Sequence, residues 1–74
     1  MGPRPRDHAY DRLTARELEV VRLMADGCEN RAMAGLMHLS EETIKSHVRH
    51  ILGKLEVGNR THAVSVCLRK GLIT

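Results

Sequence analysis

Four stretches of this chain place hydrophobic residues at the three- and four-residue spacing of an amphipathic α-helix. In residues 41–55 the apolar positions follow i, i+4, i+7, i+8 and i+11: Ile44, Val48, Ile51, Leu52 and Leu55. Ser40 stands just before this stretch as the expected N-cap, and two glutamates suit the positive end of the helix dipole. The pattern predicts a helix from about Glu41 to Leu55 with one apolar and one polar face.

The first stretch, "LTARELEVVRLMADG" (residues 13–27), carries its own start and stop signals. Thr14 and Glu17 have the spacing of a capping box, Leu13 and Leu18 have that of a hydrophobic staple, and Gly27 is the expected C-terminal stop. Apolar residues cover most of the circumference of this predicted helix: Leu18, Val20, Val21, Leu23, Met24 and Ala25. We therefore expect the helix to be nearly surrounded by others.

Residues 30–40 predict a short second helix that lies close to the third. Asn30 is the expected N-cap, the helix ends near Met37, and Met33, Ala34 and Met37 form its apolar seam. About three residues then separate the two helices. Two helices joined by so short a turn are typical of a helix-turn-helix unit.

A fourth helix is predicted from Arg60 to about Lys70, with Asn59 as its N-cap and Gly71 as its stop. Its core side is expected to consist of Ala63, Val64, Cys67 and Leu68. Its other side is expected to present Thr61, His62, Ser65, Val66 and Arg69.

The composition supports an all-α domain. The chain has 74 residues with no Phe or Trp and one Tyr, so its core has to be built from aliphatic side chains, Met and Ala. We predict one compact four-helix domain over residues 13–74, with residues 1–12 as a flexible arm or linker remnant. A basic arm that enters a DNA groove through Arg4 and Arg6 is the alternative, but the mixed charges of "MGPRPRDHAYDR" favour the first interpretation.

Nothing in the sequence indicates an enzyme, a membrane protein or a cofactor site. No Gly-rich phosphate loop or nucleophile–base pairing appears, and no run of about 18 apolar residues exists. Cys28 and Cys67 form no CxxC pair, and His47 and His50 lack further ligands at a metal-binding spacing. We expect no metal, two free and largely buried thiols, and a location in the reducing cytoplasm.

The outer face of the predicted third helix carries cationic and hydrogen-bonding side chains. At about 100° per residue, the positions opposite the apolar stripe are Glu42, Ser46, Arg49, His50 and Gly53, with Lys45 on one flank. The second helix of a helix-turn-helix enters the major groove of DNA, and Lys45 or Arg49 can each reach N7 and O6 of guanine. Ser46 either makes a short polar contact or permits close approach. Glu42 either accepts from a cytosine amino group or repels phosphates.

Candidates for phosphate contacts lie at the helix starts and at the edges of this face: Asn30, Ser40, Thr43, Lys54 and Arg60. His47 either donates to a phosphate or is a half-buried histidine bonded to a carbonyl. The formal net charge of +3 is compatible with a nucleic-acid partner.

Four segments resemble, in order and spacing, the LuxR-type (FixJ/NarL, GerE-like) DNA-binding domain: "LTARELEVVRLMADG", "NRAMAGL", "SEETIKSHVRHILGKLEV" and "NRTHAV" with "GLI". The resemblance covers residues 13–73 and implies a bacterial transcription regulator that binds double-stranded DNA. It places base contacts at Lys45, Ser46 and Arg49, and phosphate contacts near Asn30, Thr43, Lys54 and Arg60.

The resemblance also implies dimerisation through the fourth helix on a two-fold operator. From the outward face of that helix, we predict the contact near Thr61, His62, Ser65, Val66 and Arg69. Because this face is polar apart from Val66, we expect a mainly monomeric free domain that pairs on DNA. RNA polymerase is a further partner to consider, and the bacterial nucleoid is the expected location.

The chain departs from the family pattern in the second helix. Ala32 replaces a usual acid, Met33 a branched aliphatic residue, and Leu36 a position that is more often polar. A contact with a partner is one explanation for Leu36, but we expect this residue to be partly buried.

Two rivals share the scaffold. The sigma-factor domain that reads the −35 promoter element has a similar opening helix, but it usually has Ser-Arg at Ser46-His47 and lacks the "KLEVGNRTHAV" segment. A protein-interaction module that does not bind DNA is the second rival. Family members generally carry an N-terminal receiver or sensing domain, so this chain is either a stand-alone regulator or an excised output domain.

Overall fold

The computed structural model describes residues 13–74, and this part of the chain contains four helices and no strand. They are α2 (Ala15–Ala25), α3 (Asn30–Met37), α4 (Glu41–Leu55) and α5 (Arg60–Arg69). The predicted all-α helix-turn-helix fold is confirmed, including the three-residue connection between α3 and α4. The arm expected at residues 1–12 lies outside the described residues. Within residues 13–74, no helix combines the length and apolarity that crossing a membrane requires.

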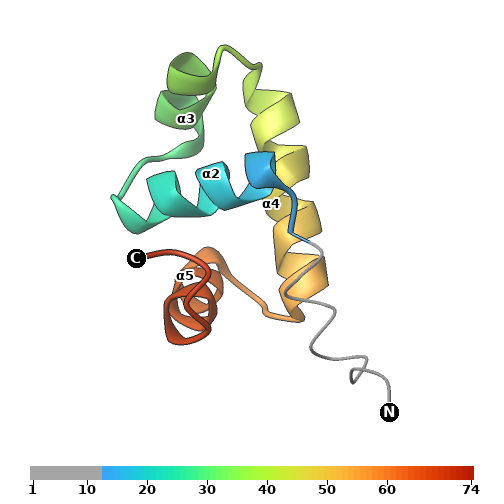
Figure 1. Cartoon of the computed structure of the whole chain (residues 1–74). Helices are drawn as coiled ribbons and strands as arrows, with labels where there is room; N and C mark the ends of the chain where they lie inside the picture. Colours follow the sequence, from blue (N-terminus) through green and yellow to red (C-terminus); the bar gives the residue numbers. More distant parts are fainter. Residues whose placement is uncertain (1–12) are drawn as a thin grey trace.

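α4 is the longest helix, and the other three are arranged along it (Figure 1). α3 packs against α4 near its N-terminal end, while α5 lies near its C-terminal end. α2 lies between them and contacts both α4 and α5. This arrangement leaves the side of α4 that faces away from α2 without a covering helix.

Three of the four predicted N-caps are confirmed. Thr14 and Glu17 form a reciprocal capping box, while the side chains of Ser40 and Asn59 accept from Thr43 N–H and His62 N–H. The prediction for α3 is wrong, because its N-cap is Glu29, which makes no side-chain cap hydrogen bond. Asn30 is instead the first helical residue, and its amide oxygen accepts from Arg60.

All four helices end in the same way. The second or third residue beyond each helix end donates its N–H to a carbonyl five residues earlier: Cys28 to Leu23, Leu39 to Ala34, Val57 to Leu52, and Leu72 to Cys67. This is the Schellman arrangement, in which the residue before the donor adopts the left-handed conformation. Glycine occupies that position after α2 and α5, but after α3 and α4 it is occupied by His38 (φ 58°) and Glu56 (φ 57°). The four donor residues are half-buried against the core.

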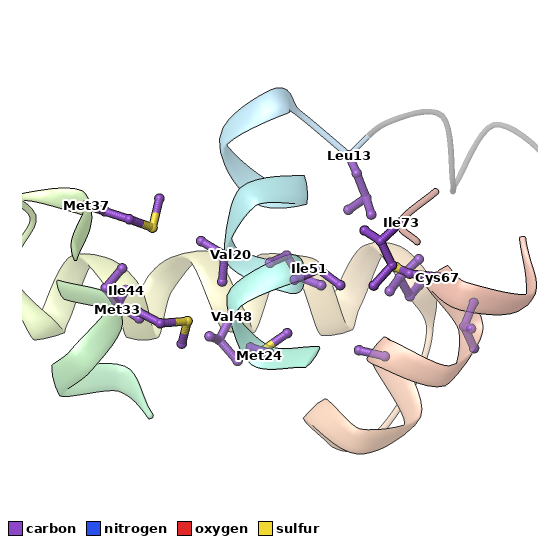
Figure 2. Close-up of a cluster of buried hydrophobic side chains, with 14 of the residues drawn as sticks. Leu13, Val20, Met24, Met33, Met37, Ile44, Val48, Ile51, Cys67 and Ile73 are labelled. Carbon is purple, nitrogen blue, oxygen red and sulfur yellow. The ribbon is translucent and has the colours of Figure 1, made fainter. Parts of the chain in front are cut away.

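The core contains only aliphatic and sulfur-bearing side chains from all four helices and from the two ends of the domain (Figure 2). Its buried members are Leu13, Val20, Val21, Met24, Met33, Ala34, Met37, Ile44, Val48, Ile51, Leu55, Ala63, Val66, Cys67 and Ile73. Met33 and Met37 lie beside Ile44 at one end, and Leu13, Cys67 and Ile73 meet at the other. Both cysteines are free thiols, and burial raises the pKa of the Cys67 thiol.

The structure corrects the predicted orientation of α5. Val66, expected on the outer side, is only 7% exposed and belongs to the core, whereas Leu68, expected in the core, is 49% exposed. The buried face of α5 runs along Ala63, Val66 and Cys67, which are spaced i, i+3 and i+4. Val66 therefore cannot be part of an outer dimer contact.

Two further expectations about burial are wrong. Leu36 on α3 is 62% exposed rather than partly buried, because α3 packs mainly against α4 and turns this position to solvent. Ala25, at the end of α2, is also exposed. α2 is therefore less completely surrounded than its apolar circumference predicts.

Candidate nucleic-acid interface

The uncovered side of α4 carries the side chains that the sequence assigns to base contacts. Lys45 and Arg49 are exposed, and Ser46 is half-buried between them. Glu42, His50 and Gly53 are exposed on the same side, while Ile44, Val48, Ile51 and Leu55 are buried against the core. The amphipathic pattern thus orients α4 with its polar face outward.

Both long cations on this face contact a residue one turn closer to the N-terminus of α4. The Arg49 guanidinium donates to Ser46 Oγ at 3.3 Å, and Lys45 Nζ lies 3.8 Å from Glu42 Oε1. Side chains on a helix lean toward its N-terminus, so residues three apart meet in this way. The pairs hold the two cationic groups over the N-terminal half of the outer face.

Ser40 and Thr43 are coupled in the N-terminal turn of α4. Ser40 Oγ accepts from Thr43 N–H at 3.0 Å and donates to Thr43 Oγ1 at 2.9 Å. The two hydroxyl groups are therefore held together within the cap of α4. Their contacts with phosphates stay predictions.

Asn30 and Arg60 are brought together although they are 30 residues apart. The Arg60 guanidinium donates to Asn30 Oδ1 at 2.7 Å, which joins the first residue of α5 to the first residue of α3. This bond leaves the amide Nδ2 of Asn30 and further guanidinium N–H groups of Arg60 as donors. Two residues that are predicted to contact phosphates, and that belong to separate helices, therefore lie side by side.

Lys54 has a structural role that the sequence did not indicate. Its Nζ lies 2.8 Å from Oε1 of Glu17, whose side chain is buried at the start of α2. Burial raises the pKa of Glu17, but the Lys54 hydrogen bond, the Thr14 N–H and the Lys54 charge together outweigh it and hold the pKa below its usual value. The Lys54 ammonium already binds the Glu17 carboxylate. The phosphate contact predicted for Lys54 stays a prediction.

The remaining predicted residues occupy two places. His47 is half-buried on the flank of α4, between the core stripe and the outer face. Thr61, His62, Ser65 and Arg69 are exposed on α5, and Leu68 lies among them in place of Val66. Among residues 13–74, no group of three or more His, Cys, Asp or Glu side chains is arranged to hold a metal ion.

Residues 11–67 match the family described as "Bacterial regulatory proteins, luxR family" (GerE). Over 68 residues, the chain is 43% identical to the response regulator protein VraR of Staphylococcus aureus and to VraR of Staphylococcus epidermidis. These alignments cover 92% of this chain and 32% of each relative, so the chain spans about a third of their length.

A solved structure gives the same result at the level of the fold. The response regulator ChrA of a heme-sensing two-component system superposes on 97% of this chain with a TM-score of 0.81 and 38% sequence identity. The superposed region is 33% of ChrA. The expected LuxR-type resemblance is therefore confirmed, and the sigma-factor alternative is set aside.

Proposed function

The chain belongs to the luxR family of bacterial regulatory proteins, and on this basis we propose that it is the DNA-binding output domain of a transcription regulator. Residues 13–74 would form the DNA-binding unit. The similarity to response regulators supports placing it in a protein of that class, where a partner domain receives the signal. Such a domain acts at the bacterial nucleoid, and RNA polymerase is a further candidate partner.

The observation that carries this proposal is the uncovered cationic face of α4, the second helix of the helix-turn-helix. Its Lys45 and Arg49 side chains project outward from the N-terminal half, which is the part of a recognition helix that meets base edges. We assign base contacts to Lys45, Ser46 and Arg49. The phosphate contacts are assigned, as the sequence predicts, to Asn30, Ser40, Thr43, His47, Lys54 and Arg60.

A dimer on a two-fold operator is the second part of the proposal. The exposed side of α5 presents Thr61, His62, Ser65 and Arg69 around the half-exposed Leu68. Leu68 gives this surface the apolar centre that Val66 was expected to provide. Because one leucine buries little area, we expect the free domain to be mainly monomeric and to pair when two half-sites hold it in place.

The test is a binding selection from random duplex DNA with the wild-type chain, Lys45→Ala and Arg49→Ala, followed by a salt titration. We expect an inverted repeat with half-sites about one helical turn apart, and a relaxed base preference in each variant. Arg31→Ala is the matched control, since Arg31 is an exposed cation on α3 and not on the outer face of α4.

The competing interpretation is a protein-interaction module with the same fold. It predicts no selected motif, together with equally weak binding and the same salt dependence for wild type and both α4 variants. That result would show that Lys45 and Arg49 on α4 do not read base edges in the major groove. Sedimentation that shows a tight dimer at micromolar concentration without DNA would contradict only the expectation that the free domain is mainly monomeric.

A further inference from the structure

We propose that Glu42 determines specificity by accepting a hydrogen bond from the exocyclic amino group of a cytosine in the major groove. This inference rests on the proposed function, because it requires α4 to enter the groove. It adds an acceptor to a set of base contacts that otherwise consists of two cations and a serine.

The position of Glu42 suits a contact with a base edge. It is the second residue of α4, and its side chain is 81% exposed. Ser46 and Arg49 follow it at i+4 and i+7, so the three lie along one line of the outer face. A side chain on this line in the first turn of a recognition helix faces the floor of the groove.

The charge of Glu42 would be repelled by DNA phosphates if it entered the groove alone. The ammonium of Lys45, 3.8 Å from Glu42 Oε1, offsets this charge in the free domain. The two side chains then present an acceptor and a donor side by side. This pair matches the cytosine amino group and the guanine O6 and N7 atoms of neighbouring base pairs.

A purely structural role for Glu42 would be to stabilise the helix dipole, and Glu41 allows the two roles to be separated. Glu41 has the same charge, is exposed and stands in the same first turn. It lies about 100° around the helix from Glu42, toward the apolar stripe. Loss of either carboxylate therefore has a similar effect on the dipole and on net charge, but only Glu42 lies over the bases.

The experiment is a selection from random duplex DNA with wild type, Glu42→Ala, Glu42→Gln and Glu41→Ala. We expect wild type to select a cytosine at one position of each half-site. Glu42→Ala should lower that preference by about tenfold, and Glu42→Gln should shift it toward adenine, with which a glutamine can pair. Glu41→Ala should keep the wild-type motif. Both alanine variants should bind random duplex more tightly, because each removes a negative charge.

Far-UV circular dichroism on the same samples is the control for folding, and the spectra of the variants should match wild type, because both positions are exposed. If Glu42→Ala, Glu42→Gln and Glu41→Ala all select the wild-type motif, Glu42 acts only through its charge, and the inference is overturned while the proposed function stands. If wild type selects no motif, the proposed function is overturned and the inference with it.

Discussion

Lys54 Nζ lies 2.8 Å from Glu17 Oε1, so the last turn of α4 is attached to the first turn of α2. The same carboxylate oxygen also accepts the backbone N–H of Thr14 at 2.9 Å. One oxygen atom thus takes part in both a helix cap and an ion pair between helices. Since Glu17 is buried, water cannot readily replace either partner.

The first prediction concerns the stability that this carboxylate provides. Glu17→Ala should lower the free energy of unfolding by about 2–4 kcal/mol, because it removes the carboxylate half of the capping box and leaves the half-buried Lys54 without its partner. Urea unfolding followed by far-UV circular dichroism measures the change. Glu19→Ala, at an exposed position of the same helix, should stay within about 0.5 kcal/mol of wild type. Equal losses in the two variants would contradict the role given to Glu17.

The second prediction concerns pH. The pKa of Glu17 in the folded chain is below its ordinary value of 4.5, so its ionised form stabilises the fold fully above that value. As the pH falls below about 4.5, the unfolded chain takes up the proton first, and this stabilisation is progressively lost. Urea midpoints measured from pH ~7 to pH ~3 should therefore fall more steeply for wild type than for Glu17→Gln. Parallel curves for the two proteins would show that Glu17 does not couple to folding.

The third prediction separates the two apolar residues of α5. Val66→Ala should destabilise the domain by about 1–3 kcal/mol, because it opens a cavity in the core. Leu68→Ala should change stability by less than about 0.5 kcal/mol, but it should reduce cooperative binding to duplexes with two half-sites. Binding to a duplex with one half-site serves as the control and should be unaffected. Unchanged cooperativity in Leu68→Ala would remove this residue from the proposed dimer contact.

The fourth prediction concerns the left-handed residue that ends α4. Glu56 has a φ of 57°, a conformation that costs a non-glycine residue about 1 kcal/mol. Glu56→Gly should therefore raise the free energy of unfolding by about 0.5–1 kcal/mol. Glu19→Gly, placed inside α2, should lower it by about 1 kcal/mol. A loss of stability in both variants would show that the strain at Glu56 is compensated by its side chain.

The elements with local sequence signals agree with the predictions made from them. The bounds of α4 follow from Ser40 and from an apolar pattern with a single possible face, and the start of α2 follows from the capping box. The base-contact candidates on α4 were placed on its outer face for the same reason, since an unambiguous stripe determines what lies opposite. Their contacts with DNA stay predictions.

The orientation of α5 was wrong because its sequence allows two apolar faces. Ala63 and Cys67 can be buried together with either Val64 and Leu68 or Val66, and only packing against α2 and α4 decides between these sets. The failure at Asn30 has a similar origin. The Asn30 side chain accepts a hydrogen bond from Arg60, 30 positions away, and no local sequence pattern reveals such a contact. No local pattern indicates the Glu17–Lys54 pair either, because it too joins residues that are distant in the sequence.

The absence of aromatic side chains from the core has a practical consequence for spectroscopy. The chain contains no tryptophan, and Tyr10, its one aromatic residue, lies outside the described part. The packed domain therefore has no intrinsic fluorophore of its own. A tryptophan in place of the exposed Leu36 would be the sole indole in this chain. Its emission would report, without background, whatever comes to lie against that side of α3.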